Sequence, residues 1–236
     1  MDVKGSVALV TGANRGIGRH FVQQLVARGA AKVYATARKP ERVDVPGVEV
    51  LSLDVTDPAS VAAAAAIATD VTLLINNAGV AARQNLVDGD LDEIRLELDT
   101  LFWGSLHTVR AFAPVLEHNG GGAVLNVLSA MSWFSYEGAN SYAVAKAAQW
   151  ALTNGVRLEL ARQRTLVTAM HMGAVDTEMM AGYDVDKLAP ADVVNAALDG
   201  LEAGQLEILV DDASRQVKAA LAADPSALYP QTVAAG

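Results

Sequence analysis

Short apolar runs alternate along the chain with longer segments in which apolar residues recur at helical spacing. The runs have the length of strands and the segments between them have the length of helices, a pattern that predicts parallel β-α-β units. We expect strands at Val7–Val10, Lys32–Ala35, Val48–Leu53, Val71–Ile75, Ala123–Leu128, Leu166–Met170 and Leu206–Val210. We expect helices at Ile17–Arg28, Pro58–Ala68, Leu91–Leu116, Ser141–Arg162, Pro190–Ala203 and Ala213–Ala222. Seven strands with helices on both faces predict the α/β class and a Rossmann fold with a doubly wound parallel sheet.

The length and composition of the chain predict a single domain, residues 1–236. Of its 236 residues 52% are hydrophobic, which is enough for one sizeable core. The first strand is expected almost at once and no apolar run has the length of a membrane span, so we expect no signal peptide, no membrane partner and a cytoplasmic location. No metal-ligand spacing occurs among the four histidines, so no metal is expected. The net charge of −9 argues against nucleic acid as a partner.

Tyr142 and Lys146 are the first candidates for chemistry. They stand four residues apart within a predicted helix, so their side chains share one face. A nearby ammonium favours the phenolate and moves the pKa of the tyrosine towards neutrality, where the phenol can exchange a proton. The pair is weak evidence by itself, because exposed helices carry this spacing by chance.

A glycine-rich turn follows the first predicted strand and precedes the first predicted helix. In Thr11–Gly18, Gly12 permits a sharp exit from the strand, and Gly16 lets a pyrophosphate approach the backbone. Gly18 lets the helix pack closely on the sheet, with its N-terminus facing the phosphates. An ordinary strand-to-helix connection is the alternative for the glycines alone. Their combination with the Tyr-Lys pair favours a dinucleotide site.

With these motifs in place, the chain resembles the short-chain dehydrogenase/reductases, in the branch with Thr-Gly-x-x-x-Gly-x-Gly near the start and Tyr-x-x-x-Lys past the middle. Further matches are Asp54–Val55, Asn76–Gly79, Ser129 and Met172–Thr177. Ser129 lies thirteen residues before Tyr142, which is the family's usual separation. The matches follow the family's order over nearly the whole chain.

The resemblance implies a catalytic role for Ser129, Tyr142 and Lys146. Tyr142 would protonate a carbonyl oxygen as a hydride arrives from the nicotinamide, and Ser129 would hydrogen-bond to the same oxygen. Lys146 would lower the pKa of Tyr142 and bind the nicotinamide ribose. Ser129 could instead cap a neighbouring backbone group, and Ser132 is a weaker rival for its catalytic place.

The end of the second predicted strand indicates the cofactor. An NAD site would place a carboxylate there, whereas this chain has Arg38 and Lys39, and Arg15 adds a third cation from the glycine turn. Guanidinium groups bind a 2′-phosphate by charge-assisted bonds, so NADP(H) is expected, with solvated surface charges as the alternative. The cofactor-binding residues implied by the resemblance are Gly12, Asn14, Arg15, Gly16, Ile17, Gly18, Arg38, Asp54, Val55, Asn77, Ala78, Gly79, Tyr142, Lys146, Gly173, Val175 and Thr177.

Two positions depart from the family. Leu101 stands where a fourth catalytic residue, usually Asn, is found three positions before Gly104. Leucine has no side-chain hydrogen bond to give, which puts in doubt both the usual kink of the helix and the water that relays protons from the lysine. Met172 replaces the usual Pro, so a fixed φ is lost and a flexible thioether is gained beside the nicotinamide.

Bulky residues gather in the segments that should face the substrate. Such residues either pack as core or line an apolar site, and the second possibility favours a hydrophobic, aromatic or cyclic ketone. The candidate pocket residues are Met131, Trp133, Phe134, Tyr136, Met172, Met179, Met180 and Tyr183.

The leading hypothesis is an NADP(H)-dependent carbonyl reductase or secondary alcohol dehydrogenase acting on a small-molecule substrate, a bulky hydrophobic or aromatic carbonyl compound. A non-redox lyase or dehalogenase is one alternative, but such relatives typically lose the glycine turn, which is intact here. A regulatory dinucleotide-binding module is another, favoured by Leu101 and opposed by the three catalytic residues. The segments 91–116 and 141–162 carry more apolar residues than one core face needs, so a homodimer or homotetramer is expected.

Overall fold

The computed structural model describes residues 1–232, so the last four residues of the predicted domain lie outside the described part. Its seven strands form one parallel sheet in the order β3-β2-β1-β4-β5-β6-β7, which confirms the predicted α/β class and doubly wound sheet. The strands are β1 Val7–Thr11, β2 Lys32–Ala37, β3 Glu49–Ser52, β4 Leu73–Asn76, β5 Gly122–Val127, β6 Thr165–His171 and β7 Glu207–Leu209.

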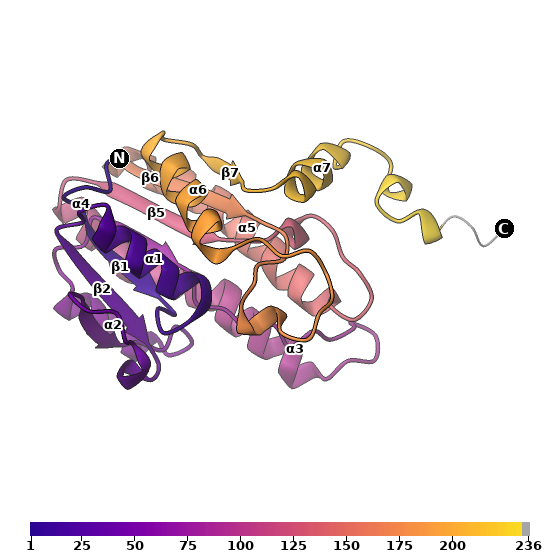
Figure 1. Cartoon of the computed structure of the whole chain (residues 1–236), viewed down its shortest axis with the longest axis horizontal. Helices are drawn as coiled ribbons and strands as arrows, with labels where there is room; N and C mark the ends of the chain where they lie inside the picture. The colour runs from indigo at the N-terminus through magenta and orange to yellow at the C-terminus, as the bar shows by residue number, and fades with distance from the viewer. Residues whose placement is uncertain (233–236) are drawn as a thin grey trace.

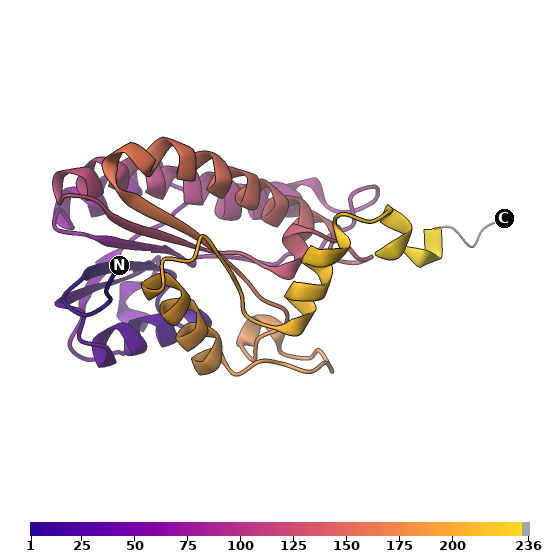
Figure 2. The same cartoon turned by 90° about the horizontal axis from the view of Figure 1, so that it is seen from above.

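Helices cover both faces of the sheet (Figure 2). Helices α1 and α6 pack against each other on one face, while α4 lies beside α2 and α5 on the other. The helices are α1 Gly16–Ala27, α2 Pro58–Ile67, α3 Leu91–Leu98, α4 Gly104–His118, α5 Asn140–Leu160, α6 Pro190–Glu202 and α7 Asp212–Ala220. Figure 1 shows α7 and the segment after it extending beyond the end of the sheet, away from α1 and β2.

The two layers of helices bury two apolar cores, one on each side of the sheet. All four residues of β4 are buried, because this strand has helices above and below it and neighbours on both edges. Phe21 of α1 anchors one core and Phe112 of α4 anchors the other, and both side chains are fully buried. Truncating either phenyl group to Ala would cost about 3–5 kcal/mol of stability.

The long helix predicted over residues 91–116 is divided. A π-helical turn, Asp99–Trp103, separates α3 from α4. The helix is therefore irregular at this point, although Leu101 stands in place of the usual Asn. Two close contacts accompany the turn. A Cβ on Gly104 would come within 2.7 Å of Val55, and Leu101 is buried against Gly79. Packing against these neighbours therefore holds the turn here without an amide side chain at position 101.

Candidate active site

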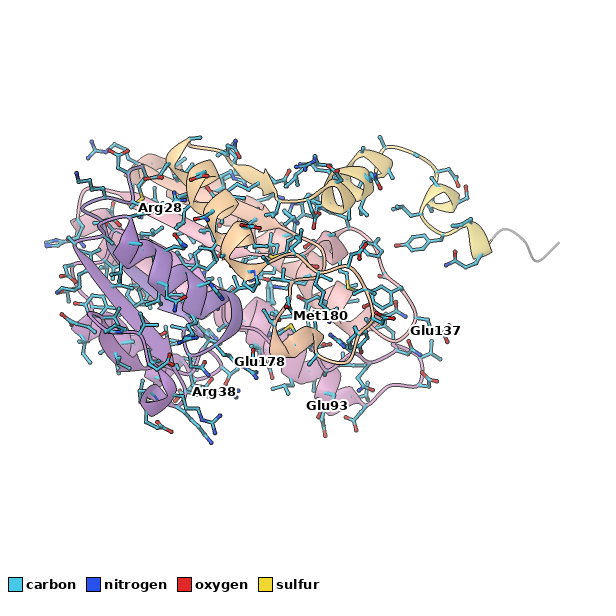
Figure 3. All side chains as sticks on the ribbon, in the orientation of Figure 1. Arg28, Arg38, Glu93, Glu137, Glu178 and Met180 are labelled. Atoms are coloured by element: carbon cyan, nitrogen blue, oxygen red, sulfur yellow. The ribbon has the colours of Figure 1, made fainter. Side chains whose placement is uncertain are left out.

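The site lies at the carboxyl ends of the strands, where the strand order reverses between β1 and β4. A single cavity of about 960 Å³ extends from the glycine turn to the segments after β5 and β6. All seventeen predicted cofactor-binding residues line it, from Gly12 to Thr177. In Figure 3, Arg38, Glu178 and Met180 lie in this order across the molecule, from the predicted adenosine end towards the predicted substrate end.

The glycine turn has the close backbone contacts that the motif predicts. Gly12 and Gly16 have φ values of 67° and 51°, which L side chains rarely adopt. A Cβ on Gly18 would lie 2.2 Å from the Gly12 carbonyl oxygen, so only glycine fits there. Asn77, directly after β4, stabilises the turn, because its Nδ2 donates to the carbonyl oxygens of Thr11 at 2.9 Å and Gly12 at 3.2 Å.

The adenosine end of the cavity is positively charged. Arg15 and Arg38 are exposed at its rim, Arg42 lines it with them, and none of the three forms an ion pair within residues 1–232. The carboxylate of Asp54 is occupied in a turn, where it accepts from the backbone N–H of Thr56 at 3.0 Å and from its hydroxyl at 2.8 Å. Unpaired guanidinium groups and the missing acid after β2 fit a dinucleotide that carries a 2′-phosphate.

Ser129, Tyr142 and Lys146 meet at the wall of the cavity. Ser129 follows β5 and caps a short 3₁₀ turn, Ala130–Ser132, by accepting the Met131 N–H at 3.1 Å. Its hydroxyl also hydrogen-bonds with Tyr142, which lies in the first turn of α5. Ser132 does not line the cavity, and its buried hydroxyl has no partner among the described residues. The capping and catalytic interpretations of Ser129 are thus compatible, and the geometry favours it over Ser132.

The electrostatics of Tyr142 differ from the sequence expectation. Burial raises the pKa of Tyr142 above its ordinary value, and the Glu97 carboxylate raises it further, while Arg83 and the Ser129 hydrogen bond oppose the rise. Lys146 does not bring this pKa towards neutrality, because burial lowers the lysine's own pKa to about 7. Tyr142 is therefore a neutral phenol that can donate its proton.

Lys146 points along the inner side of α5. Its Nζ hydrogen-bonds to the carbonyl oxygen of Val127 at 2.7 Å and to Oε1 of Gln149 at 2.9 Å, and it lies 5.7 Å from the centre of the Tyr142 ring. Gln149 in turn donates to the Ser105 hydroxyl at 2.8 Å. A buried polar chain thus runs from the lysine towards α4, and no sequence pattern indicated it.

Both departures from the family lie at the cavity. Leu101 and Met172 line it and are almost fully buried, so both side chains contribute apolar surface to its wall. After Met172, Gly173 donates its N–H to Asp211 at 2.6 Å, and a Cβ there would come 2.9 Å from the same carboxylate oxygen. Asp211, which also caps α7, positions this segment in place of a fixed proline ring.

The predicted substrate residues separate into two groups. Those that line the cavity are Met131, Phe134, Tyr136, Met172, Met179, Met180 and Tyr183. Trp133 does not line it. Its ring stacks on His171 at 3.8 Å and meets Trp150 edge-on at 6.1 Å, so it packs beneath the loop that begins with Ser129. The sequence of residues 133–136 does not show which of its three aromatic rings faces the cavity and which packs in the core.

Two charged residues near Tyr142 escaped the sequence analysis. Glu97 of α3 is fully buried, and Arg83 lines the cavity from the loop after β4. Each affects the pKa of Tyr142, in opposite directions. The one available signal was the acid itself, which interrupts the apolar residues Leu96 and Leu98 in a helix expected to pack on a core.

Within residues 1–232 no three His, Cys, Asp or Glu side chains are grouped so as to hold a metal ion. None of the helices in this part of the chain combines the length and apolarity needed to cross a membrane.

Comparison with known proteins agrees with this geometry. A model of the short chain dehydrogenase family matches residues 6–188. An uncharacterised oxidoreductase of Staphylococcus aureus (strain MW2) is 31% identical over 208 residues, which cover 83% of this chain and 90% of that protein. A solved short-chain dehydrogenase of Burkholderia cenocepacia J2315, in complex with NADP, is 39% identical with a TM-score of 0.93, and 98% of each chain is covered.

A second solved structure shares the fold at lower identity. It is a short-chain dehydrogenase/reductase of Burkholderia phymatum in complex with NAD, with 22% identity, a TM-score of 0.84, and coverage of 98% of this chain and 96% of that one. The family match, the relatives, the parallel sheet and the Ser129-Tyr142-Lys146 constellation lead to one conclusion. The chain is an oxidoreductase that belongs to the short-chain dehydrogenase/reductase family.

Proposed function

We propose that the protein is an NADP(H)-dependent carbonyl reductase or secondary alcohol dehydrogenase. The observation that carries the proposal is one cavity shared by the glycine turn, the cations Arg15 and Arg38, and the catalytic residues Ser129, Tyr142 and Lys146. The predicted cofactor agrees with the NADP bound by the similar Burkholderia cenocepacia dehydrogenase. Its phosphates would lie over the turn at the N-terminus of α1, with Arg15 and Arg38 holding the 2′-phosphate.

When NADPH is bound, its nicotinamide supplies the hydride that forms the new C–H bond at the carbonyl carbon. Ser129 donates a hydrogen bond to the carbonyl oxygen, which stabilises the negative charge that develops as the C–O double bond opens. Tyr142 then transfers its proton to that oxygen to give the alcohol. In the oxidative direction the alcohol returns this proton to the phenolate.

Lys146 is suited to return a proton to Tyr142. Its pKa of about 7 means that charged and neutral amine are both present near neutral pH. Gln149 and the Val127 carbonyl hold the amine on the inner side of α5. We assign to this pair the positioning of the lysine that an amide at position 101 cannot provide here.

The substrate class follows from the cavity wall. Met131, Phe134, Met179 and Met180 supply an apolar surface of flexible thioethers and one phenyl ring, which suits a bulky hydrophobic or aromatic carbonyl compound. A cytoplasmic enzyme assembled as a homodimer or homotetramer remains our proposal. The oligomer is supported by apolar side chains exposed around α5, among them Leu158 with 79% of its surface accessible.

A non-redox function is the second candidate, and it is less well supported because the glycine turn and its contacts are intact. The test is NADPH oxidation, followed by nicotinamide absorbance, with a panel of aryl ketones. We expect the unmodified protein to oxidise NADPH when a ketone is present, and we expect Tyr142→Phe to lose this activity. Tight NADPH binding without turnover of any carbonyl compound would favour the regulatory module instead.

A further inference from the structure

Arg83 brings a positive charge into the otherwise apolar end of the cavity. It lies on the loop between β4 and α3, and its guanidinium stacks on the Tyr183 ring with 3.9 Å between the guanidinium carbon and the ring centre. Nη2 donates to the Met179 carbonyl oxygen at 2.7 Å and lies 3.2 Å from the Met180 sulfur. The charge is near enough to Tyr142 to lower the pKa of that phenol, against the larger effect of burial. Arg83 thus stands between the substrate wall and the proton donor.

The backbone of Arg83 is held in an unusual conformation. Its φ of 60° is uncommon for a residue with a side chain and costs about 1–3 kcal/mol. The buried carboxylate of Glu97 stabilises it, because Oε1 accepts the N–H of Ala82 at 2.7 Å and the N–H of Arg83 at 3.1 Å. An ordinary surface cation would not need a strained backbone and a buried carboxylate to hold it. The conformation directs the Arg83 guanidinium towards the cavity.

The charge of Arg83 is unmatched. In residues 1–232 no carboxylate lies within ion-pair distance of its guanidinium, and both of its hydrogen bonds come from Nη2. The two acids that line the cavity belong to the cofactor end. Asp54 is bonded to Thr56, and Glu178 lies near Gly16, with its Oε2 3.9 Å from where a Cβ on that glycine would be. Nε and Nη1 therefore remain for a ligand.

We infer that Arg83 binds an anionic group of the substrate, most simply a carboxylate on a hydrophobic or aromatic ketone. A guanidinium whose face is fixed by an aromatic ring presents its N–H edge to a carboxylate, with charge-assisted hydrogen bonds in the fork geometry that arginine favours. The apolar wall binds the body of the substrate, Tyr142 and Ser129 receive its carbonyl, and Arg83 fixes its remote end. This inference rests on the proposed reductase function and adds a substrate class to it.

The structure also offers a mechanical explanation for Arg83. Its contacts with Met179, Met180 and Tyr183 join the loop after β4 to the segment after β6, so its purpose could be to hold that segment over the cavity. The two explanations differ in what they require of the substrate. A latch acts equally on charged and neutral substrates, whereas an anion-binding group discriminates between them.

The experiment compares an aryl ketone that carries a ring carboxylate with its carboxamide, which has nearly the same shape and no charge. Arg83→Gln removes the charge, Arg83→Lys keeps it without the fork, and Arg95→Gln is the matched control because Arg95 is an exposed cation on α3. We expect Arg83→Gln to lower kcat/KM for the carboxylate about 10- to 100-fold and for the carboxamide less than about 3-fold. Arg83→Lys should lie between, and Arg95→Gln should match the unmodified protein.

Calorimetry with benzoate and the NADP⁺-loaded protein separates binding from turnover. Benzoate binding that is lost in Arg83→Gln would support the inference even if no ketone were reduced, in which case the reductase proposal alone would fail. Equal loss of activity towards both compounds would identify Arg83 as a latch and overturn the inference. A carboxylate that is neither bound nor preferred by the unmodified protein would overturn it as well.

Discussion

The cofactor half and the substrate half of the cavity are built in different ways. Around Gly12 and Gly18 the wall is backbone, held by contacts so close that a single methyl group does not fit. Around Met131, Met179 and Met180 the wall is side chain, and thioethers can adjust to shapes that a backbone cannot. One enzyme can therefore hold a large constant ligand rigidly and still adapt to a variable one.

Tyr142 belongs to both halves, so changing it should have the largest effect. Tyr142→Phe removes the proton donor and leaves the ring in place, and turnover should fall about 10²- to 10⁴-fold while NADPH affinity stays nearly constant. Steady-state kinetics and a cofactor titration check this. Ser129→Ala should also impair turnover. Ser132→Ala is its matched control, because it removes one hydroxyl as well and should leave turnover unchanged. Full activity in Tyr142→Phe would remove the mechanism.

A pair of small substitutions compares the two halves directly. Gly18→Ala adds a methyl group that would lie 2.2 Å from the Gly12 carbonyl oxygen, so NADPH affinity should fall about 10-fold or more. Met180→Ala removes far more volume from the substrate wall and should leave that affinity within about 2-fold. Fluorescence titration with NADPH measures both. Gly155→Ala, where a Cβ meets nothing within 4 Å, controls for the methyl group itself. Similar affinities for all three variants would contradict the distinction.

Cofactor choice tests the charged end of the rigid half. Replacing Arg15 by Ala and Arg38 by Asp removes two unpaired cations and adds an acid, so the preference for NADPH over NADH should be lost and then reversed, a change of about 10²-fold in relative affinity. Dissociation constants for both cofactors provide the measurement. Equal affinity of the unmodified protein for the two would show that these cations are merely solvated.

The buried lysine makes stability depend on pH. The pKa of Lys146 falls from 10.5 to about 7 on burial, so between these values the unfolded chain binds a proton that the folded chain does not. The free energy of unfolding should therefore rise as pH increases above 7, by at most about 1.4 kcal/mol per pH unit, with the full penalty present below pH 7. Urea unfolding at pH 7, 8 and 9 measures this slope. In Lys146→Met the free energy of unfolding should depend less steeply on pH. Identical slopes in the variant and the unmodified protein would contradict the lowered pKa.

The smallest expected effect is at position 101. Leu101→Asn places an amide against Gly79 at the turn between the halves, and we expect a change of a few-fold in turnover or a shifted pH-rate profile at constant NADPH affinity. Gln149→Leu is the partner experiment, because it removes the group that holds Lys146 instead. If Leu101→Asn restores activity lost in Gln149→Leu, the two positions share one role. An unchanged profile in both variants would show that neither matters for the lysine.

The rigid half could be predicted from the sequence because its signals are local. Gly12, Gly16 and Gly18 are close in the chain as well as in space, and alternating apolar runs specify the strands on which they depend. The adaptable half depends on residues distant in sequence. Nothing near Arg83 shows that Glu97 binds its backbone, or that His171 stacks on Trp133 and turns it from the cavity. The π turn at Leu101 likewise packs against Gly79, a contact that lies outside any local pattern.

Residues 210–232, which follow β7, do not line the cavity, but they contact the loops that carry residues of the site. Asp211 binds the N–H of Gly173, Lys218 lies over the Trp133 ring, and the Tyr229 hydroxyl accepts the N–H of Ser135. These contacts support the two loops that carry Ser129 and Met172 from the outer side. Shortening the chain after Val210 would therefore relax the geometry around the reacting carbonyl.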